Sequence, residues 1–234
     1  MKMKRSEKLG MFTGLVVGVL LLLISVFMIF QTTCKVRGAE KPANATQQGI
    51  DVSSHQGKID WEQVKNSALA DYAIIRCGYG VNQTDKDDKY WDYNSSECER
   101  LGIPYGTYLY SGADTTAKAK SEAEHVVRLL QGKNLTYPIY YDMEADMLNQ
   151  LSSTQIGNIA KTFLNTMESY GYKNVAVYSN KYLFETKLTA SVFSDYPKWI
   201  AQHSNKCTYQ GSYHMWQYST QGVIPGISEK VDLN

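Results

Sequence analysis

A basic stripe, a paired cysteine motif and a metal-binding histidine motif are all missing from this sequence of 234 residues. The formal net charge is only +1, and acidic residues outnumber basic ones beyond Ala45, which excludes the positive face of a nucleic-acid-binding protein. None of the four cysteines forms a C-x-x-C pair, and none of the four histidines belongs to an HExxH motif. The sequence therefore predicts no nucleic-acid partner and no cofactor.

Charged residues are also absent between Lys8 and Lys35. Residues 9–34 are mostly apolar, and they reach the roughly 20 residues that a membrane-spanning helix needs. The run exceeds the apolar region of about 7–15 residues in a cleaved signal peptide, so we favour an uncleaved anchor over secretion after signal cleavage. Four basic residues precede the run and two follow it closely, which predicts a cytoplasmic amino terminus and an extracellular body in a single-pass membrane protein.

The chain is thus expected to have four parts. They are a basic cytoplasmic tail at 1–8, a transmembrane anchor at 9–34, a polar tether at 35–48 and a folded body at 49–234. In the body, Cys77 and Cys98 allow an extracellular disulfide, although small buried thiols are the interpretation that we favour.

The body alternates expected strands with expected helices. The strands are predicted at 50–53, 72–78, 104–110, 137–144, 174–179, 198–202, 213–219 and around 231. The helices are predicted at 61–69, 90–101, 116–130, 153–170 and 181–193. Asp114 is expected to cap the third helix, and Ser152 with Gln155 forms a capping box at the fourth.

Repeated strand-helix units predict an α/β fold with a parallel sheet. About eight strands in a body of this length favour a closed, abbreviated barrel of the TIM type over an open sheet. The later strands lack clear helices between them, so only about five helices are expected. Barrel enzymes carry their active sites at the carboxyl ends of the strands, so reactive side chains are expected at those ends.

Two carboxylates end the expected fourth strand, which reads YPIYYDME from Tyr137. Side chains alternate along a strand, so Asp142 and Glu144 point to the same side and Met143 to the other, with α-carbons about 6.6 Å apart. Like charges at that distance disfavour joint ionisation and raise one pKa, as acid/base chemistry at neutral pH requires. A strand ending in a solvated acidic turn is the alternative, and D-x-E by itself does not exclude it.

Two further aspartates favour the catalytic interpretation. Asp51 ends the first expected strand and Asp232 lies on the last. In a closed barrel these strands are neighbours, so both aspartates should face Asp142 and Glu144 across one rim. Four carboxylates from distant parts of the chain would then converge, whereas randomly placed acids would mostly lie on the outer helices.

Aromatic and amide side chains near strand ends suit a sugar-binding site, because aromatic faces stack on sugar rings and phenol hydroxyls bond their polar groups. For any single aromatic residue, packing in the core or rim is the alternative role. The candidate binding residues are Tyr79, Tyr108, Tyr110, Tyr178, Trp199, Gln202, Trp216, Gln217 and Tyr218.

Other polar residues near the predicted rim have weaker interpretations. His55, His203 and His214 lie near strand ends, which keeps a metal-dependent barrel phosphodiesterase or deacetylase as a second enzyme class, although the simpler role is hydrogen bonding. Arg76 lies in an apolar strand and is expected to pair with an inward carboxylate, for which Asp51 is the candidate.

Seven segments together resemble one known family. They are GIDVSSHQGKIDW at 49–61, IIRCGYG at 74–80, PYGTYLYS at 104–111, YYDME at 140–144, WIAQ at 199–202, WQYS at 216–219 and VDLN at 231–234. In this order they are similar to glycoside hydrolase family 25, which contains bacterial and phage lysozymes. The resemblance implies a modified barrel of eight strands and five helices. It also implies an N-acetylmuramidase that cleaves the β-1,4 bond after N-acetylmuramic acid in peptidoglycan glycan strands.

The same resemblance assigns roles to the carboxylates. It places the catalytic acid at Glu144, its partner at Asp142 and two supporting aspartates at Asp51 and Asp232. D-x-E on a barrel strand also resembles families in which the substrate acetamido oxygen attacks the anomeric carbon, which would make Asp142 an orienting group. The backbone spacing falls between those of retaining and inverting enzymes, so the stereochemical outcome stays open.

A surface module that binds peptidoglycan without cleaving it remains the non-enzymatic alternative. Loss of the acid would mark such a module, whereas Glu144 and its three companions are all present. Inhibition by a chelator would instead indicate the metal-dependent class. The sequence identifies no protein partner.

Overall fold

The computed structural model describes residues 18, 19 and 45–234. The chain divides into two units, Met1–Lys35 and Val36–Asn234, and the first is described only at Gly18 and Val19, which are helical. The predicted anchor at 9–34 therefore lies outside the described residues apart from these two, as does most of the tether. No helix within the described ranges is long and apolar enough to cross a membrane.

The body consists of nine strands, six α-helices and three short 3-10 helices within the described residues. The strands are β1 (Gly49–Val52), β2 (Tyr72–Tyr79), β3 (Tyr105–Tyr110), β4 (Ile139–Asp142), β5 (Val175–Asn180), β6 (Lys198–Ala201), β7 (Met215–Gln217), β8 (Ser219–Gly222) and β9 (Val231–Leu233). The helices are α2 (Trp61–Ser67), α3 (Trp91–Leu101), α4 (Thr116–Leu129), α5 (Ser153–Ser169), α6 (Lys181–Thr186) and α7 (Val192–Asp195). The 3-10 helices are η1 (Ser54–Gln56), η2 (Thr84–Lys86) and η3 (Asp146–Gln150).

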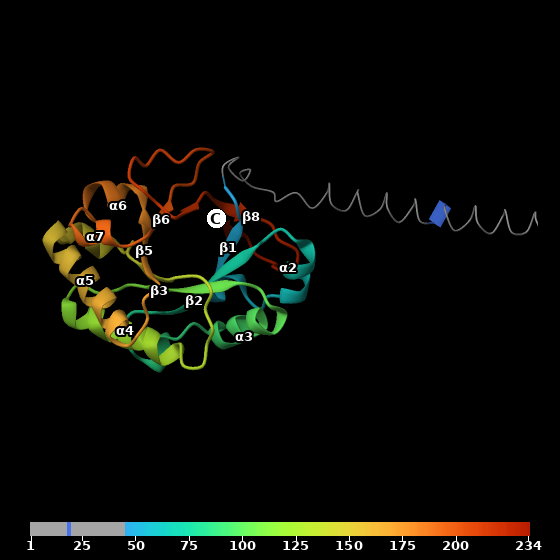
Figure 1. Cartoon of the computed structure of the whole chain (residues 1–234), viewed down its shortest axis with the longest axis horizontal. Coiled ribbons are helices and arrows are strands. Elements are labelled where there is room, and N and C mark those ends of the chain that lie inside the picture. The colour runs from blue at the N-terminus through green and yellow to red at the C-terminus, as the bar shows by residue number, and fades with distance from the viewer. Residues whose placement is uncertain (1–17, 20–44) are drawn as a thin grey trace, which may run out of the picture. The chain divides into compact units, whose positions relative to one another are not determined.

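One sheet contains all nine strands, in the order β7-β6-β5-β4-β3-β2-β1-β9-β8. Strands β1 to β7 pair in parallel with one another in chain order, and Figure 1 shows α3, α4, α5, α7 and α6 around the outside of this sheet. The predicted α/β barrel of the TIM type is confirmed in its general form. The sheet has nine strands instead of eight because the expected strand at 213–219 is divided at Tyr218.

Tyr218 explains how the sheet curls back on itself. Its backbone N–H donates to Leu233 O at 2.9 Å. At this residue the chain therefore stops pairing with β6, the partner of β7, and begins to pair with β9. The two edge strands, β7 and β8, are therefore joined through a single residue. The barrel is nearly closed through the chain itself, with no β7–β8 ladder among the described strands.

The last strand corrects one expectation. Strand β9 does lie beside β1, with Asp51 opposite Asp232, but the pairing is antiparallel. A parallel strand needs a long crossover, usually a helix, and only the residues 223–230 separate β8 from β9. Asp232 thus reaches the rim near the start of its strand and not at its carboxyl end.

Local signals fix most helix ends. Ser152 and Gln155 form the predicted capping box of α5, and the Asp60 side chain accepts from Gln63 N at the start of α2. Asp114 is not the cap of α4: Thr115 accepts from Lys118 N, while Asp114 pairs with the Lys118 ammonium.

The expected helix at 181–193 is interrupted. Helices α6 and α7 flank a turn in which Ala190 packs against Gly157 of α5, so closely that a β-carbon on Gly157 would lie 2.5 Å from the Ala190 Cβ. The bend brings the segment onto α5.

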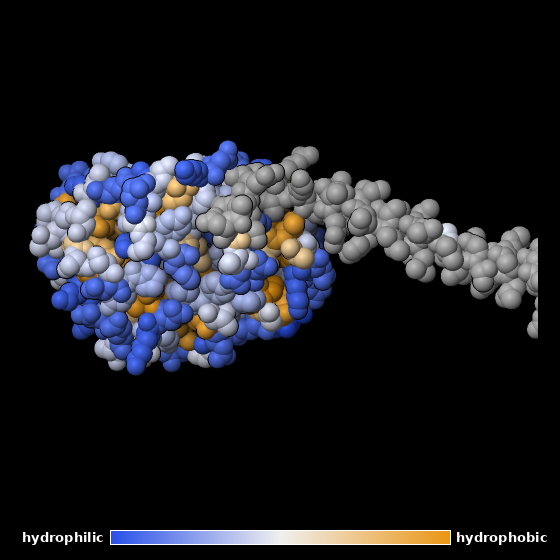
Figure 2. Space-filling view, turned by 45° about the horizontal axis from the view of Figure 1, so that its top comes forward, coloured by the Kyte–Doolittle hydropathy of each residue, from blue (hydrophilic) through white to orange (hydrophobic). Residues whose placement is uncertain are grey.

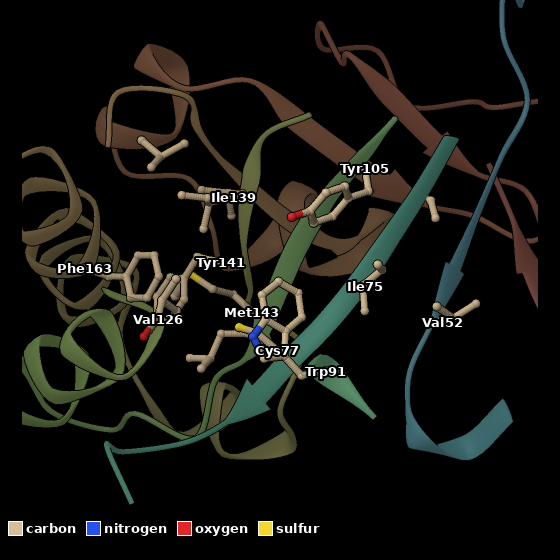
Figure 3. Close-up of a cluster of buried hydrophobic side chains, with 14 of the residues drawn as sticks. Val52, Ile75, Cys77, Trp91, Tyr105, Val126, Ile139, Tyr141, Met143 and Phe163 are labelled. Atoms are coloured by element: carbon tan, nitrogen blue, oxygen red, sulfur yellow. The ribbon is translucent and has the colours of Figure 1, made fainter. Parts of the chain in front are cut away.

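Apolar side chains gather in two layers. The outer layer fills the space between sheet and helices, and Figure 3 shows Tyr141 beside Phe163 there, with ring centroids 3.8 Å apart. The inner layer lies inside the barrel and includes Ile74, Tyr140 and Trp199. Polar side chains cover most of the surface seen in Figure 2, with small apolar groups between them.

Candidate active site

The four predicted carboxylates meet at one pocket. This pocket has a volume of about 70 Å³, and it is lined by Asp51, Tyr108, Asp142, Glu144, Tyr178, Trp199, Gln217 and Asp232. Its residues come from β1, β3, β4, β5, β6, β7 and β9 and from the segment directly after β4. The pocket is too small for a sugar ring, so it forms the floor of a site whose ligand would lie above it.

Strand alternation places the central pair as expected. Asp142 and Glu144 line the pocket, whereas Met143 is fully buried in the outer apolar layer. The strand itself ends at Asp142, but Met143 N still donates to Tyr178 O at 2.9 Å and so continues the ladder for one residue. This bond keeps Glu144 on the same side as Asp142.

Gln217 connects the two supporting aspartates. Its Nε2 donates to Asp51 Oδ2 at 2.9 Å and to Asp232 Oδ2 at 3.3 Å. Its Oε1 accepts from the Tyr178 hydroxyl at 3.0 Å, and His203 Nε2 lies 3.0 Å from the same oxygen. Because an amide oxygen only accepts, this contact places a hydrogen on His203 Nε2. Gln217 is buried and held on both sides, so it positions carboxylates and has little capacity left for a ligand.

The electrostatics of the aspartates follow from burial. Burial raises the pKa of Asp51 to about 6, although the hydrogen bonds from Gln217 and Asn234 and the charge of His203 each lower it. The pKa of Asp232 is raised to about 8 by burial and by the negative charges of Asp51 and Glu144. The four carboxyl groups therefore cannot all ionise near neutral pH, and they titrate as a coupled set.

Asp142 is the deepest of the four and the least satisfied. Its side chain is buried, and Oδ1 has no hydrogen-bond partner among the described residues. Burial, then the charges of Glu144 and Asp51, hold the pKa of Asp142 well above its ordinary value. A buried polar atom without a partner is destabilising, so this oxygen is a natural acceptor for a donor on a bound ligand.

Glu144 combines access with a raised pKa. It lies just beyond the strand end and is partly exposed, unlike Asp142. Burial and the charge of Asp51 raise the pKa of Glu144, while the Tyr178 hydroxyl and His203 act in the opposite direction. A half-buried carboxyl with a raised pKa at the mouth of a pocket can carry a proton to a bound ligand.

Two predicted tyrosines lie at the rim next to the pocket. A bulge at Cys77 makes Tyr79 the direct neighbour of Tyr110 across β2 and β3, so both point to the inner side. Burial and the charges of Asp142 and Glu144 raise the pKa of Tyr110. Tyr79 is 43% exposed at the strand tip.

Three predicted binding residues do not meet the carboxylates. Gln202 bonds both polar atoms of its amide to Thr208, and its carbonyl oxygen accepts from Trp216 Nε1 at 2.8 Å. Trp216 and Tyr218 line a different pocket, because they alternate with Gln217 along the chain and point to the opposite side of the strand from it.

Arg76 pairs with Asp88 and not with Asp51. Its Nε donates to Asp88 Oδ2 at 2.8 Å, and its other donor group reaches the Ser54 hydroxyl. Asp88 lies in the loop after β2, which folds back over the rim. Its carboxylate also accepts hydrogen bonds from Ser54 N and Tyr90 N. Arg76 still lies close enough to lower the pKa of Asp142.

The histidines are dispersed. His55 and His214 are exposed, His203 contacts Gln217, and His125 of α4 lies between Gly80 O and Asp87 Oδ1. Among the described residues, no group of three or more His, Cys, Asp or Glu side chains is arranged to hold a metal ion. Cys77 and Cys98 are buried free thiols, as favoured, and burial raises the pKa of Cys77 to about 12.

Sequence reasoning missed one direct partner of the carboxylates. Asn234 Nδ2 donates to Asp51 Oδ2 at 2.9 Å, and its Oδ1 accepts from Trp199 Nε1 at 2.8 Å. Asn234 follows Asp232 by two positions and lies directly after the last strand, so continued alternation predicts the same side for both and was the available signal.

The chain is similar in sequence and structure to known proteins. Residues 50–227 match the family model described as glycosyl hydrolases family 25. The autolytic lysozyme of Clostridium acetobutylicum is 30% identical over 187 residues, which cover 80% of this chain and 54% of that protein. The modular autolysin LytC of Streptococcus pneumoniae has a similar structure, with a TM-score of 0.73 and 34% identity over 80% of this chain and 46% of that chain.

A family 25 glycosyl hydrolase from Bacillus anthracis shares the fold with a TM-score of 0.73, at 20% identity over 84% of this chain and 91% of that chain. A second structure of LytC, with a TM-score of 0.72 and 33% identity over 80% of this chain and 46% of that chain, is a complex with a synthetic peptidoglycan ligand. The chain spans about half the length of the autolytic lysozyme and of LytC.

Proposed function

The chain belongs to glycosyl hydrolases family 25 and is therefore a glycoside hydrolase, and we propose that it cleaves the β-1,4 bond between N-acetylmuramic acid and N-acetylglucosamine in peptidoglycan. The lysozyme and autolysin among its relatives support this substrate, as does the peptidoglycan ligand of LytC. The convergence of four carboxylates on one pocket is the observation that carries the proposal.

In this mechanism Glu144 is the general acid. Its raised pKa favours the protonated carboxyl group, and its partial exposure lets it reach the glycosidic oxygen. The proton moves to that oxygen as the bond to the anomeric carbon breaks, and the leaving sugar departs as an alcohol. The Glu144 carboxylate then takes a proton from the water that attacks the anomeric carbon, which restores the acid.

Asp142 orients the substrate acetamido group, which is the first group to attack the anomeric carbon. The substrate acetamido oxygen forms a bond to the anomeric carbon while its N–H donates to the unpartnered Asp142 Oδ1. The resulting cyclic cation lies against Asp142, and its positive charge favours the ionised form of this buried carboxyl group. Water later opens the cation to give the retained anomer. Asp51 and Asp232, held by Gln217, tune the ionisation of the pair and contact substrate from the opposite side of the pocket.

The test is digestion of purified peptidoglycan sacs by the full-length chain, with mass spectrometry of the products after borohydride reduction. We expect reduced ends on N-acetylmuramic acid. Glu144→Gln should lower kcat by about 10²–10⁴-fold without loss of fold, because it removes the proton donor. Asp146→Asn is the matched control, since it removes an exposed carboxylate two residues away and should leave kcat unchanged.

Three results would contradict parts of the proposal. Reduced ends on N-acetylglucosamine would assign the other bond, and near-normal turnover by Glu144→Gln would remove the acid from the mechanism. An inverted first product, or a glycosyl ester trapped on Asp142, would exclude the acetamido route.

We also propose that residues 9–34 anchor the enzyme in the cell membrane with its body outside. The uncharged run and the basic residues before it support this topology. Protease added to intact cells stripped of their wall should digest the body. A protected body, or a mature amino terminus between Gly38 and Thr46, would contradict the anchor.

A further inference from the structure

A second pocket, of about 350 Å³, opens at the other end of the barrel. Tyr72, at the start of β2, and Tyr137, just before β4, line it together with residues at the start of β7. Asn234, after the antiparallel β9, lies at the same end. These positions are the amino ends of the parallel strands, so the pocket faces away from the carboxylate rim.

The barrel interior separates the two pockets. Ile74, Tyr140 and Trp199 fill the space between them. Asn234 joins the two ends, since it lines the second pocket and donates to Asp51. A ligand at the amino end would therefore be a different one from the sugar that is cleaved.

Aromatic side chains make up much of the second pocket. The rings of Tyr72 and Tyr137 stack with centroids 4.3 Å apart and an interplanar angle of 15°. Tyr213 is 40% exposed, and Trp216 is partly exposed beside it. Partly exposed aromatic faces in a concave site offer apolar contact area at low entropic cost, and they suit the apolar faces of sugar rings.

The polar side chains of this pocket are mostly hydroxyl and amide groups, together with the imidazole of His214. No Asp, Glu, Lys or Arg side chain belongs to its lining within the described residues. Thr46 and Gln47 supply an exposed hydroxyl and an exposed carboxamide, and the Tyr137 hydroxyl donates to Gln47 Oε1 at 2.7 Å. A lining without carboxylate, ammonium or guanidinium side chains offers little compensation for desolvating a charged ligand, so an uncharged ligand is favoured.

We propose that this pocket binds an N-acetylated sugar residue of a second glycan strand. A volume of about 350 Å³ lies within the range of small-molecule sites, and hydroxyl and amide groups match the acetamido and hydroxyl groups of such a sugar. The choice of ligand rests on the proposed function. Binding of a neighbouring strand would raise the effective concentration of substrate at the carboxylate rim without touching the reacting bond.

The first test is calorimetry with chitotetraose, a neutral N-acetylated tetrasaccharide. The full-length chain carrying Glu144→Gln should bind two molecules, and adding Tyr213→Ala should leave one. Tyr182→Ala removes an aromatic side chain that is 63% exposed on α6 and outside this pocket, so it should retain two. A single binding event before Tyr213→Ala, or two events after it, would overturn the proposal.

The second test uses the active chain on two substrates. On peptidoglycan sacs Tyr213→Ala should raise KM about tenfold at unchanged kcat, the effect of losing one aromatic contact. On a soluble tetrasaccharide of alternating N-acetylglucosamine and N-acetylmuramic acid, the same variant should match the unaltered chain. An unchanged KM on sacs would overturn the second site, whereas an unaltered chain that fails to cleave either substrate would instead contradict the proposed function.

Discussion

A buried carboxyl group lies on each face of strand β4, and the two groups differ in how completely they are hydrogen-bonded. On the inner face, Asp142 is buried with one oxygen that has no partner among the described residues. On the outer face, the next side chain along, Tyr141, donates to Glu122 Oε2 of α4 at 2.6 Å. The same Glu122 oxygen accepts from Ser111 Oγ at 2.9 Å, and its other oxygen accepts from Gly112 N at 2.8 Å.

Burial raises the pKa of both groups, so burial alone does not distinguish them. Glu122 has no exposed surface and three donors, and it ties the segment after β3 to β4. Asp142 has two negative neighbours, Glu144 and Asp51, and an acceptor oxygen to which no group in the described part of the chain donates. The comparison indicates that incomplete hydrogen bonding, more than burial or a raised pKa, marks the carboxylate that is kept for a ligand.

The largest expected effect is on the inner face. Asp142→Asn should lower kcat by about 10²–10³-fold, because the amide no longer compensates the positive charge of the cyclic intermediate. The same change should raise the free energy of unfolding by about 1 kcal/mol, since it removes a buried carboxyl group among like charges. Turnover on peptidoglycan sacs and urea denaturation would measure the two effects. A variant that is both active and less stable would contradict the assignment.

The outer face should respond in the opposite way. Glu122→Ala leaves three donors without their acceptor, two of them on buried side chains, and should reduce the free energy of unfolding by about 3 kcal/mol. Glu122→Gln keeps one acceptor oxygen and should lose about half as much. In both variants the folded protein should keep its kcat within about threefold, because Glu122 does not line the pocket. A loss of kcat as large as that of Asp142→Asn would remove the distinction between the faces.

A third effect concerns the dependence of stability on pH. The pKa of Asp51 is raised from 3.8 to about 6 and that of Asp232 from 3.8 to about 8, so the folded protein keeps protons that the unfolded chain has released. Unfolding therefore releases protons in this range, and stability should fall as pH rises from about 4 to about 8.

Calorimetric melting across that range would measure this dependence. Each kcal/mol lost corresponds to about 2–4 °C in Tm for a body of this size. Asp232→Asn should flatten the curve because it removes the higher of the two titrations. A Tm that rises from pH 4 to pH 8 would contradict the raised pKa values at the rim.

Sequence alone determined the features that depend on near neighbours. Alternation along β4 put Asp142 and Glu144 on one side and Met143 on the other. The capping box of α5 and the cap at Asp60 were also predictable, because the groups that bond lie within three residues of each other. The order of strands and helices followed from hydrophobic periodicity, and with it the rim to which the acids belong.

Tertiary structure decided whatever depends on competing partners. Arg76 forms its ion pair with Asp88 and not with Asp51, because the loop that carries Asp88 folds back over the rim. No pattern within β2 predicts the path of that loop. Strand β9 pairs antiparallel because the connection from β8 is too short for a crossover.

The same holds for the aromatic residues. Periodicity says which side chains share a side of a strand, but the change of partner at Tyr218 decides which end of the barrel they line. Trp216 and Tyr218 were thus assigned to the carboxylate rim by sequence and placed at the amino end by the fold. The physical reason is that local geometry fixes a direction for each side chain, whereas its neighbours are set by hydrogen bonds between segments that lie far apart in the chain.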